Sequence, residues 1–239
     1  MHPDILSLVA SAAEKGFVVR LISNGILLDE ELVVALKRAG LGWCSVSLDG
    51  PTPAIHDAFR RHPHCFARAT DALRYLVRHG VPCNIVTVAR RELVESGKLD
   101  DIVKLGEDLG VSVVRINFPV PLGRFKGQNN QVLTLAEREE VRKLLRYGNT
   151  TMELPREKTT CKAGVTKVNV LPNGDVTPCV FVPVPYGNIR KDSFEDIWKS
   201  MRDFSRSFRI SGQCPACDPA MNARIFEAAD VRRTVCRSA

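Results

Sequence analysis

The feature that most constrains the fold is an alternation of short apolar segments and amphipathic helical segments over the first 150 residues. The apolar segments predict strands at 17–23, 42–48, 81–88 and 111–118. The segments between them predict helices that each stop at a glycine, at 30–39, 65–79 and 97–109. Nearly continuous apolar strands joined by helical crossovers indicate a parallel sheet. The sequence therefore predicts an α/β fold, either a sheet covered on both faces or part of a barrel.

Short polar side chains stand where these predicted strands end. They are Ser23 and Asn24 at the first strand, Ser47 and Asp49 at the second, Thr87 at the third and Asn117 at the fourth. Active residues of parallel α/β folds gather at the carboxyl ends of the strands. These positions predict a site for a small molecule.

The order of the first elements is unusual, because a predicted helix at 3–15 leads directly into the first strand. Four parallel strands form neither a closed barrel nor a protected sheet. We expect further strands that precede these and are absent from this sequence. The alternative is an open sheet whose edge the first helix covers.

The character of the chain changes near residue 150, where a charged stretch leads into a cysteine-containing segment. Alternating residues from Val165 and a turn at 172–175 predict a hairpin. Asp192 or Ser193 then caps a helix. We predict two domains, an α/β domain at 1–150 and a small cysteine-rich hairpin-plus-helix domain at 151–239.

The chain contains 8 cysteines, and four of them cluster at Cys161, Cys179, Cys214 and Cys217. A disulfide framework is not expected, because the start lacks a secretory signal and the chain is large enough for an ordinary core. The Cys214–Cys217 gap lets one loop supply two ligands to one metal centre. Four thiolates suit tetrahedral zinc or an iron–sulfur cluster, and the spacing leaves both open, together with four unrelated cysteines.

Charge and hydropathy exclude other classes of protein. The net charge is +7, but Lys and Arg are spread along the chain beside Asp and Glu, so we expect no nucleic-acid partner. No apolar run reaches the roughly 18 residues of a membrane helix. We therefore expect no membrane span and a cytoplasmic location.

The segments 23–25, 45–50 and 56–60 occur in an order that resembles the radical S-adenosylmethionine (radical SAM) enzymes. The tail, from Cys161 through 174–179 to 187–190, resembles their auxiliary-cluster extension, which occurs as a two-cluster SPASM form or a one-cluster twitch form. The resemblance covers nearly the whole chain. It implies a partial (β/α) barrel in which the four predicted strands are the third to sixth of the family's barrel.

The resemblance also implies roles for single residues. Ser47 and Asp49 match positions that face the ribose and methionine end of SAM, and Arg60 matches an arginine near the SAM carboxylate. Ser23 and Asn24 match residues that line the same cavity. The structural alternatives are that Asp49 caps the following turn and that Arg60 pairs with Asp57. His56 is interpreted as a turn residue, and no catalytic residue is predicted.

Two family motifs are missing from this sequence: the three-cysteine loop for the SAM-cleaving cluster and the Gly-Gly-Glu segment that binds the methionine amine. The tail match favours the twitch form, since no cysteine lies between 218 and 230. The resemblance thus implies one auxiliary 4Fe–4S cluster on Cys161, Cys179, Cys214 and Cys217, used for electron transfer or structure.

The resulting prediction is a radical SAM oxidoreductase or maturase that modifies a peptide, protein or tetrapyrrole and is incomplete for catalysis as this chain. Its cofactors are a 4Fe–4S cluster and, in the complete enzyme, SAM. Its partners are a peptide or small-molecule substrate and a reductant such as ferredoxin or flavodoxin. The alternatives are a complementing chain that donates the missing strands, and a non-enzymatic binding module or degenerate paralogue in which the four cysteines hold a structural zinc ion.

Overall fold

The computed structural model describes residues 2–125, 129–152, 162–207 and 223. The chain divides into two compact units. Unit 1 consists of Met1–Phe118 and Leu133–Glu153, and unit 2 consists of Pro119–Val132 and Leu154–Ala239. The predicted division at residue 150 differs from these bounds mainly in 119–132. Each unit is described by itself.

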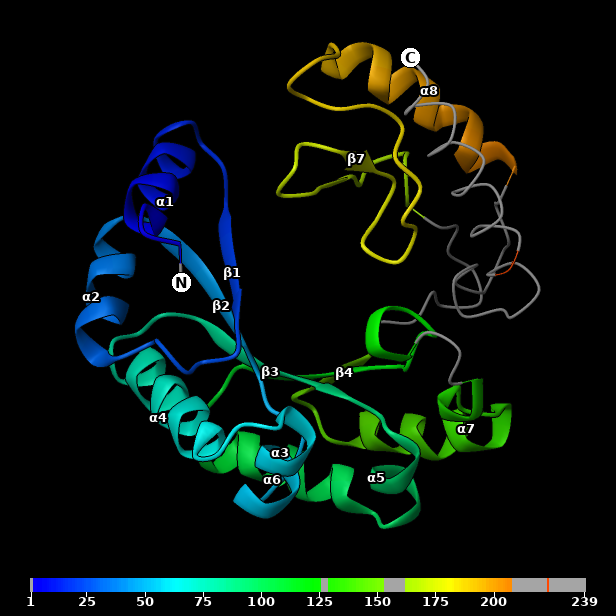
Figure 1. The fold of residues 1–239 in the computed structure, drawn as a ribbon. Coiled ribbons are helices and arrows are strands. Elements are labelled where there is room, and N and C mark those ends of the chain that lie inside the picture. Colours follow the sequence, from blue (N-terminus) through cyan, green and yellow to red (C-terminus); the bar gives the residue numbers. More distant parts are fainter. Residues whose placement is uncertain (1, 126–128, 153–161, 208–222, 224–239) are drawn as a thin grey trace. The chain divides into compact units, whose positions relative to one another are not determined.

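Unit 1 is built on a five-stranded parallel sheet (Figure 1). Its strands are β1 (Val19–Ser23), β2 (Leu41–Ser47), β3 (Cys83–Val88), β4 (Val113–Asn117) and β5 (Thr150–Met152). They follow one another in chain order across the sheet, and each neighbouring pair is parallel. Sequential order without a reversal is the pattern of a barrel segment, whereas a doubly wound sheet reverses its strand order.

The helices of unit 1 are α1 (Ile5–Glu14), α2 (Glu30–Arg38), α3 (Pro53–Arg60), α4 (Cys65–Arg78), α5 (Arg91–Glu95), α6 (Lys98–Asp108) and α7 (Leu135–Arg142), followed by a 3-10 turn at Lys143–Arg146. Figure 1 shows α2, α4 and α6 on the same side of the sheet. Fully buried Leu73 and Leu76 of α4 and Ile102 of α6 form the core with the apolar residues of the strands. Helices on one side and sequential strands confirm the predicted partial barrel.

The apolar pattern predicted β1 to β4 and helices α1, α2, α4 and α6 to within a few residues. The expectation of four strands was wrong, because β5 adds a fifth. This strand has only three residues and two of them are threonines, so it carries no apolar run. Helices α3, α5 and α7 are also additional to the predicted elements.

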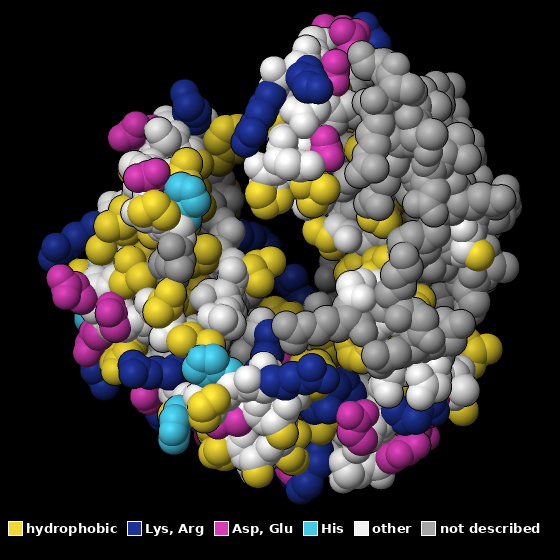
Figure 2. All heavy atoms as spheres, viewed as in Figure 1, with side chains coloured by type: hydrophobic (Ala, Val, Ile, Leu, Met, Phe, Trp, Pro, Cys, Tyr) yellow, Lys and Arg dark blue, Asp and Glu magenta, His cyan; other side chains and the backbone are white. Residues whose placement is uncertain are grey.

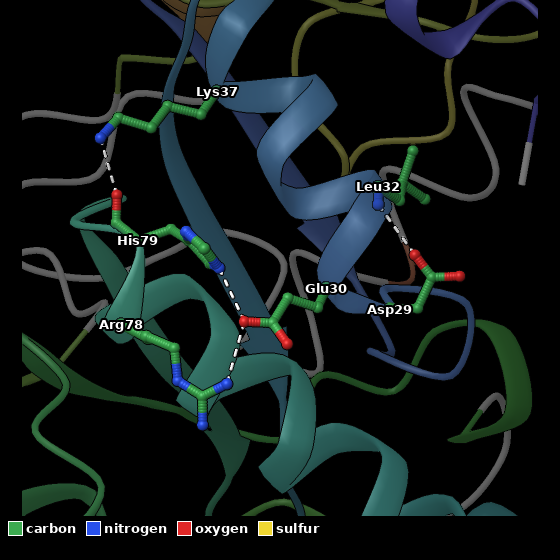
Figure 3. A network of polar contacts seen from close by, with 6 residues as sticks. All are labelled: Asp29, Glu30, Leu32, Lys37, Arg78 and His79. Carbon is green, nitrogen blue, oxygen red and sulfur yellow. Dashed lines mark hydrogen bonds and ion pairs between the residues drawn. The ribbon is translucent and has the colours of Figure 1, made fainter.

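A polar network on the outer surface joins α2 to α4 (Figure 3). The side chain of Asp29 caps α2 by accepting a hydrogen bond from Leu32 N at 2.8 Å. In the next residue, Glu30 accepts hydrogen bonds from His79 Nε2 at 2.8 Å and Arg78 Nη1 at 2.9 Å. These hydrogen bonds, with His79 contributing most, lower the pKa of Glu30. The first turn of α2 is thereby tied to the last turn of α4.

The described part of unit 2 contains a hairpin and a helix. Strands β6 (Asn169–Val170) and β7 (Val176–Thr177) pair antiparallel, and α8 spans Phe194–Ser207. Two short 3-10 turns, Gly123–Phe125 and Asn129–Gln131, belong to the same unit. Ser193 Oγ accepts from Asp196 N at 3.2 Å, which confirms one of the two predicted caps. The sequence also predicts a last helix near 219–231, which lies outside the described residues apart from Ala223.

Two further observations concern the charge of the surface and the length of the helices. Figure 2 shows Lys and Arg interspersed with Asp and Glu over the helices of unit 1 on the face drawn. Among the described residues, none of the helices combines the length and apolar character that crossing a membrane requires.

Candidate functional site

The two faces of the sheet in unit 1 differ in what covers them. A Cβ atom on Gly106 of α6 would lie 2.4 Å from Val114 Cγ2 and 3.5 Å from Ile85 Cδ1, so these side chains pack against that helix. On β4, Val114 and Ile116 are fully buried, whereas Arg115 between them points the other way and is partly exposed. We call this second face the open face. By strand register it carries Arg20, Ile22, Trp43, Ser45, Ser47, Asn84, Val86, Val88, Val113, Arg115, Asn117 and Thr151.

Three side chains form a hydrogen-bonded group on the open face. Asn84 Oδ1 accepts hydrogen bonds from Trp43 Nε1 at 2.5 Å and from Ser45 Oγ at 2.6 Å. The other end of the amide donates to Ile85 O at 3.1 Å. Asn84 is 1% exposed, so its buried amide holds the indole in one plane. The Arg20 guanidinium lies 5.6 Å from the centroid of the Trp43 ring.

Asp49 lies at the centre of a second network, at the carboxyl end of β2. It is 1% exposed, and its carboxylate forms an ion pair with Arg60 and accepts a hydrogen bond from Val88 N at 3.1 Å. Its carbonyl accepts from Arg90 Nη2 at 2.9 Å, and its own N–H donates to His56 Nδ1 at 2.9 Å. The predicted pair Asp49 and Arg60 is therefore brought into direct contact. The network fixes the turn after β2 against β3 and α3.

His56 and Asp57 serve the backbone around this network. Burial lowers the pKa of His56, so its neutral ring accepts from Asp49 N. Asp57 caps the start of α4 by accepting from His64 N and Phe66 N, both at 2.8 Å. The interpretation of His56 as a turn residue was wrong, because His56 lies in α3 and is 1% exposed; its ring accepts from the backbone of the turn after β2. Among the described residues, the ion pair of Arg60 goes to Asp49 and not to Asp57.

The other predicted SAM-site residues are more separated. Ser23 pairs in register with Val46 on the helix-covered face, and its Oγ accepts from Gly25 N at 3.1 Å. Asn24 Oδ1 accepts from Ile26 N at 3.1 Å, so both side chains stabilise the turn after β1. Ser47 lies on the open face. The roles of Ser23, Asn24, Ser47, Asp49 and Arg60 in binding SAM remain predictions.

The cysteines of unit 1 are buried thiols. Cys44 on β2 and Cys83 on β3 are register neighbours, and Cys65 begins α4. Burial raises the pKa of Cys44 to about 12 and that of Cys65 and Cys83 to about 11. Metal ligands bind as thiolates, and burial disfavours that form of these three side chains.

Of the four predicted cluster ligands, Cys179 alone lies within the described residues; Cys161, Cys214 and Cys217 lie outside them. Cys179 is 8% exposed and packs with Ala163, Val182 and Val184. Gly164 N donates to Pro178 O at 3.2 Å, so the segment that follows Cys161 runs beside the segment that holds Cys179. The hairpin is predicted to bring the thiolates of Cys161 and Cys179 together, and this stays a prediction because Cys161 lies outside the described residues.

The glycines and polar residues of the tail motif have a structural function. Gly174 has φ +92°, and a Cβ there would lie 2.6 Å from Asn188 Oδ1. Asn188 Nδ2 donates to Asp175 Oδ1 at 3.0 Å and to Asn173 O at 3.1 Å. A Cβ on Gly187 would lie 2.7 Å from Ile197 Cγ1. The motif residues thus hold the hairpin turn against the 187–190 loop, so closely that a side chain on Gly174 or Gly187 does not fit.

Fold and motifs together define an iron–sulfur protein with a partial (β/α) barrel. The Radical SAM superfamily model matches residues 1–118, and the SPASM model, an iron–sulfur cluster-binding domain, matches residues 161–218. The chain belongs to the radical SAM superfamily and carries a SPASM domain.

Particular relatives are similar over most of this chain. The AdoMet-dependent heme synthase of Nitratidesulfovibrio vulgaris is 32% identical over 91% of this chain and 68% of its own length. The PqqA peptide cyclase of Gluconobacter oxydans is 27% identical over 82% of this chain and 59% of its own length. The crystal structure of Streptococcus suis SuiB bound to S-adenosylmethionine superposes with a TM-score of 0.69 at 17% identity, over 87% of this chain and 54% of that one. This chain therefore spans between about half and two thirds of the lengths of these proteins.

An iron–sulfur cluster and SAM are the cofactors of this family, and two features of the described residues fit SAM. Asn117 Oδ1, on the open face at the end of β4, is buried and accepts no hydrogen bond within the described residues. Arg60 Nε is likewise a buried donor without a partner there. A ligand with both hydrogen-bond donors and a carboxylate, such as SAM, satisfies atoms of this kind.

The sequence patterns did not single out Arg90, Asn84 or Arg115 as candidate site residues. Arg90 is 7% exposed and lies 4.1 Å above the Phe59 ring. A charged residue just after an apolar strand is a weak signal, because most such residues are solvated. Asn84 and Arg115 stand inside predicted strands, where a polar residue in an apolar run was the one available signal.

Proposed function

We propose that this chain is the larger part of an S-adenosylmethionine-dependent enzyme that modifies a tetrapyrrole. The observation that carries the proposal is the similarity to the heme synthase, which extends over 91% of this chain, from the barrel into the SPASM domain. The relative named as a peptide cyclase is less similar and matches a smaller share of both proteins. A peptide substrate is therefore the second candidate, and a ferredoxin- or flavodoxin-type protein is the proposed reductant.

The proposal divides the chemistry between the predicted domains. In residues 1–150, Ser47 and Arg60 contact SAM and Asp49 positions Arg60. Ser23 and Asn24 line the same cavity through the turn after β1. Residues 151–239 hold one auxiliary 4Fe–4S cluster on Cys161, Cys179, Cys214 and Cys217. The cysteine triad that binds a SAM-cleaving cluster does not occur in this sequence, so the proposal assigns that cluster to none of these residues. When cleaved, SAM supplies the radical chemistry, and the protein binds and orients the reactants.

Arg60 is the residue whose role is best supported by contacts. Its guanidinium is positioned by the buried carboxylate of Asp49, while its Nε donor has no partner within the described residues. A carboxylate that receives this N–H gains a charge-assisted hydrogen bond from a donor already held in place. In the proposal, Asp49 therefore positions Arg60, and Arg60 binds the methionine carboxylate of SAM.

Anaerobic reconstitution of the full chain tests the proposal. We expect about four irons per chain and a broad absorption near 400 nm, as for one 4Fe–4S cluster. SAM is expected to bind without being cleaved, and Arg60→Met is expected to weaken that binding. About eight irons per chain, or SAM cleavage by this chain alone, would contradict the assignment of clusters. A colourless zinc protein would support the alternative in which the four cysteines hold a structural zinc ion.

A further inference from the structure

Arg115 is a cation on the open face that the proposed SAM site does not use. It lies on β4 in register with Val86 of β3 and Thr151 of β5. Its side chain is half-buried. Within the described residues its guanidinium makes no hydrogen bond or ion pair, in contrast to those of Arg60 and Arg90 on the same unit.

The surroundings of Arg115 make this lack of an anion costly. A guanidinium remains charged at all physiological pH values, and partial burial removes part of its hydration. Its register neighbours on the open face, Ser47, Val86 and Thr151, carry no charge, and neither do Val113 and Asn117 on its own strand. A ligand anion that pairs with this guanidinium would offset the cost of its partial burial.

The open face also offers a flat aromatic surface. Trp43 lies on the same face two strands away and four residues before Ser47, the β2 residue level with Arg115. Asn84 fixes its indole, and the Arg20 guanidinium lies over the ring, 5.6 Å from its centroid. Fixed aromatic side chains favour planar ligands, because stacking then costs little conformational entropy. A tetrapyrrole with carboxylate side chains combines a planar aromatic ring with peripheral anions.

We propose that the open face binds the tetrapyrrole substrate, with Arg115 paired to a peripheral carboxylate and Trp43 against the ring. This inference rests on the proposed function and adds the chemical group by which the substrate is selected. It assigns Arg115 to the substrate, whereas Arg60 is assigned to SAM.

Binding of metal-free protoporphyrin IX to the full chain tests the inference, because a porphyrin without iron cannot coordinate to cysteine. The probe is compared with its dimethyl ester by fluorescence titration. Arg115→Met is expected to weaken protoporphyrin binding about ten-fold or more, as for loss of a charge-assisted hydrogen bond, and to leave ester binding unchanged. Arg115→Lys should restore part of the affinity. Arg38→Met, at an exposed position on α2, is the matched control and should bind as the wild type does.

A second measurement separates a binding role from a structural one. Since Arg115 has no anion to lose in the described structure, Arg115→Met should unfold at the same temperature as the wild type or higher. A marked loss of thermal stability would show a structural partner and overturn the inference. So would equal protoporphyrin binding by the variant and the wild type, or a loss of SAM affinity in the variant. If the wild type binds no porphyrin while SAM still binds, the tetrapyrrole substrate class itself is wrong.

Discussion

Unit 1 contains a five-stranded sheet with a continuous apolar core, whereas the described part of unit 2 contains two strands of two residues each. The buried residues of unit 2 form small groups, one around Cys179 and one of Val176, Ile197 and Met201. Burial of apolar surface is sufficient to specify a barrel segment of this size. Small units with little core usually need a metal or another cross-link. We infer that unit 1 is held by its core and unit 2 by its cluster together with a few specific contacts.

The largest expected effect comes from Cys179→Ala. This variant should lose its iron, and the amides of unit 2 should lose protection from hydrogen exchange while those of β2, β3 and β4 keep theirs. Metal-coupled folding of small units is worth on the order of 10 kcal/mol, far more than one side chain. Mass-spectrometric hydrogen exchange measures both units in one sample. Cys83→Ala, which removes a buried thiol from unit 1, should retain the iron; equal iron loss in both variants would refute the difference between the units.

Asp49→Asn should give the largest effect within unit 1 that does not involve the apolar core. The substitution removes the negative charge from the Asp49 side chain, which is 1% exposed. Its ion-pair partner Arg60, with a side chain that is 33% exposed, keeps its positive charge. We expect a loss of about 2–4 kcal/mol in the free energy of unfolding, because breaking a buried ion pair leaves a charge without its partner. Urea denaturation measures this loss. Asp71→Asn removes an exposed partner of Arg74 and should cost less than about 1 kcal/mol.

Gly174→Ala tests the specific contacts of unit 2. The new methyl group must enter a space where Asn188 Oδ1 lies 2.6 Å away, on a backbone with φ +92°. We expect the variant to lose about 1–3 kcal/mol of stability in this part of unit 2. Hydrogen exchange should show the loss as reduced protection of the hairpin amides. Gly123→Ala, also in unit 2, has φ +57° and no atom within 4 Å of its Cβ, so it should cost less. A larger effect at Gly123 would show that backbone conformation, not the contact with Asn188, requires the glycine.

The smallest expected effect is that of Glu30→Gln on the α2–α4 junction. The pKa of Glu30 is lowered from its ordinary value of 4.5 by His79 and Arg78, so the folded state binds its proton less readily than the unfolded chain. The resulting stabilisation is present above the ordinary pKa and is lost as the pH falls through the lowered folded value. The difference between the unfolding temperatures at pH 7 and pH 3 should therefore be slightly smaller in the variant than in the wild type. Glu31→Gln, the same substitution at the next residue of α2, is the matched control, and an equal change in both variants would contradict the prediction.

The elements of unit 1 show how much of the fold and of the site the sequence could predict. Apolar periodicity located β1 to β4, because a buried strand needs a run of apolar residues, and it missed β5 because Thr150 pairs in the sheet without such a run. Resemblance to the family selected both Asp49 and Arg60, but the ion pair between them depends on the placement of α3, which was not predicted. Arg115 could not be recognised as a candidate, because only the three-dimensional structure shows that its guanidinium has no counter-ion among the described residues.

The buried thiols of unit 1 have a practical consequence for chemical labelling. With pKa values of about 11 and 12, Cys44, Cys65 and Cys83 have at most about one thiolate in a thousand molecules at pH 8. Alkylating reagents and mild oxidants act on thiolates, so the three thiols of the folded barrel should react very slowly with both. A thiol count on the folded apoprotein therefore reports the cysteines outside the barrel, and the fall in that count on adding iron and sulfide measures how many of them the cluster has taken.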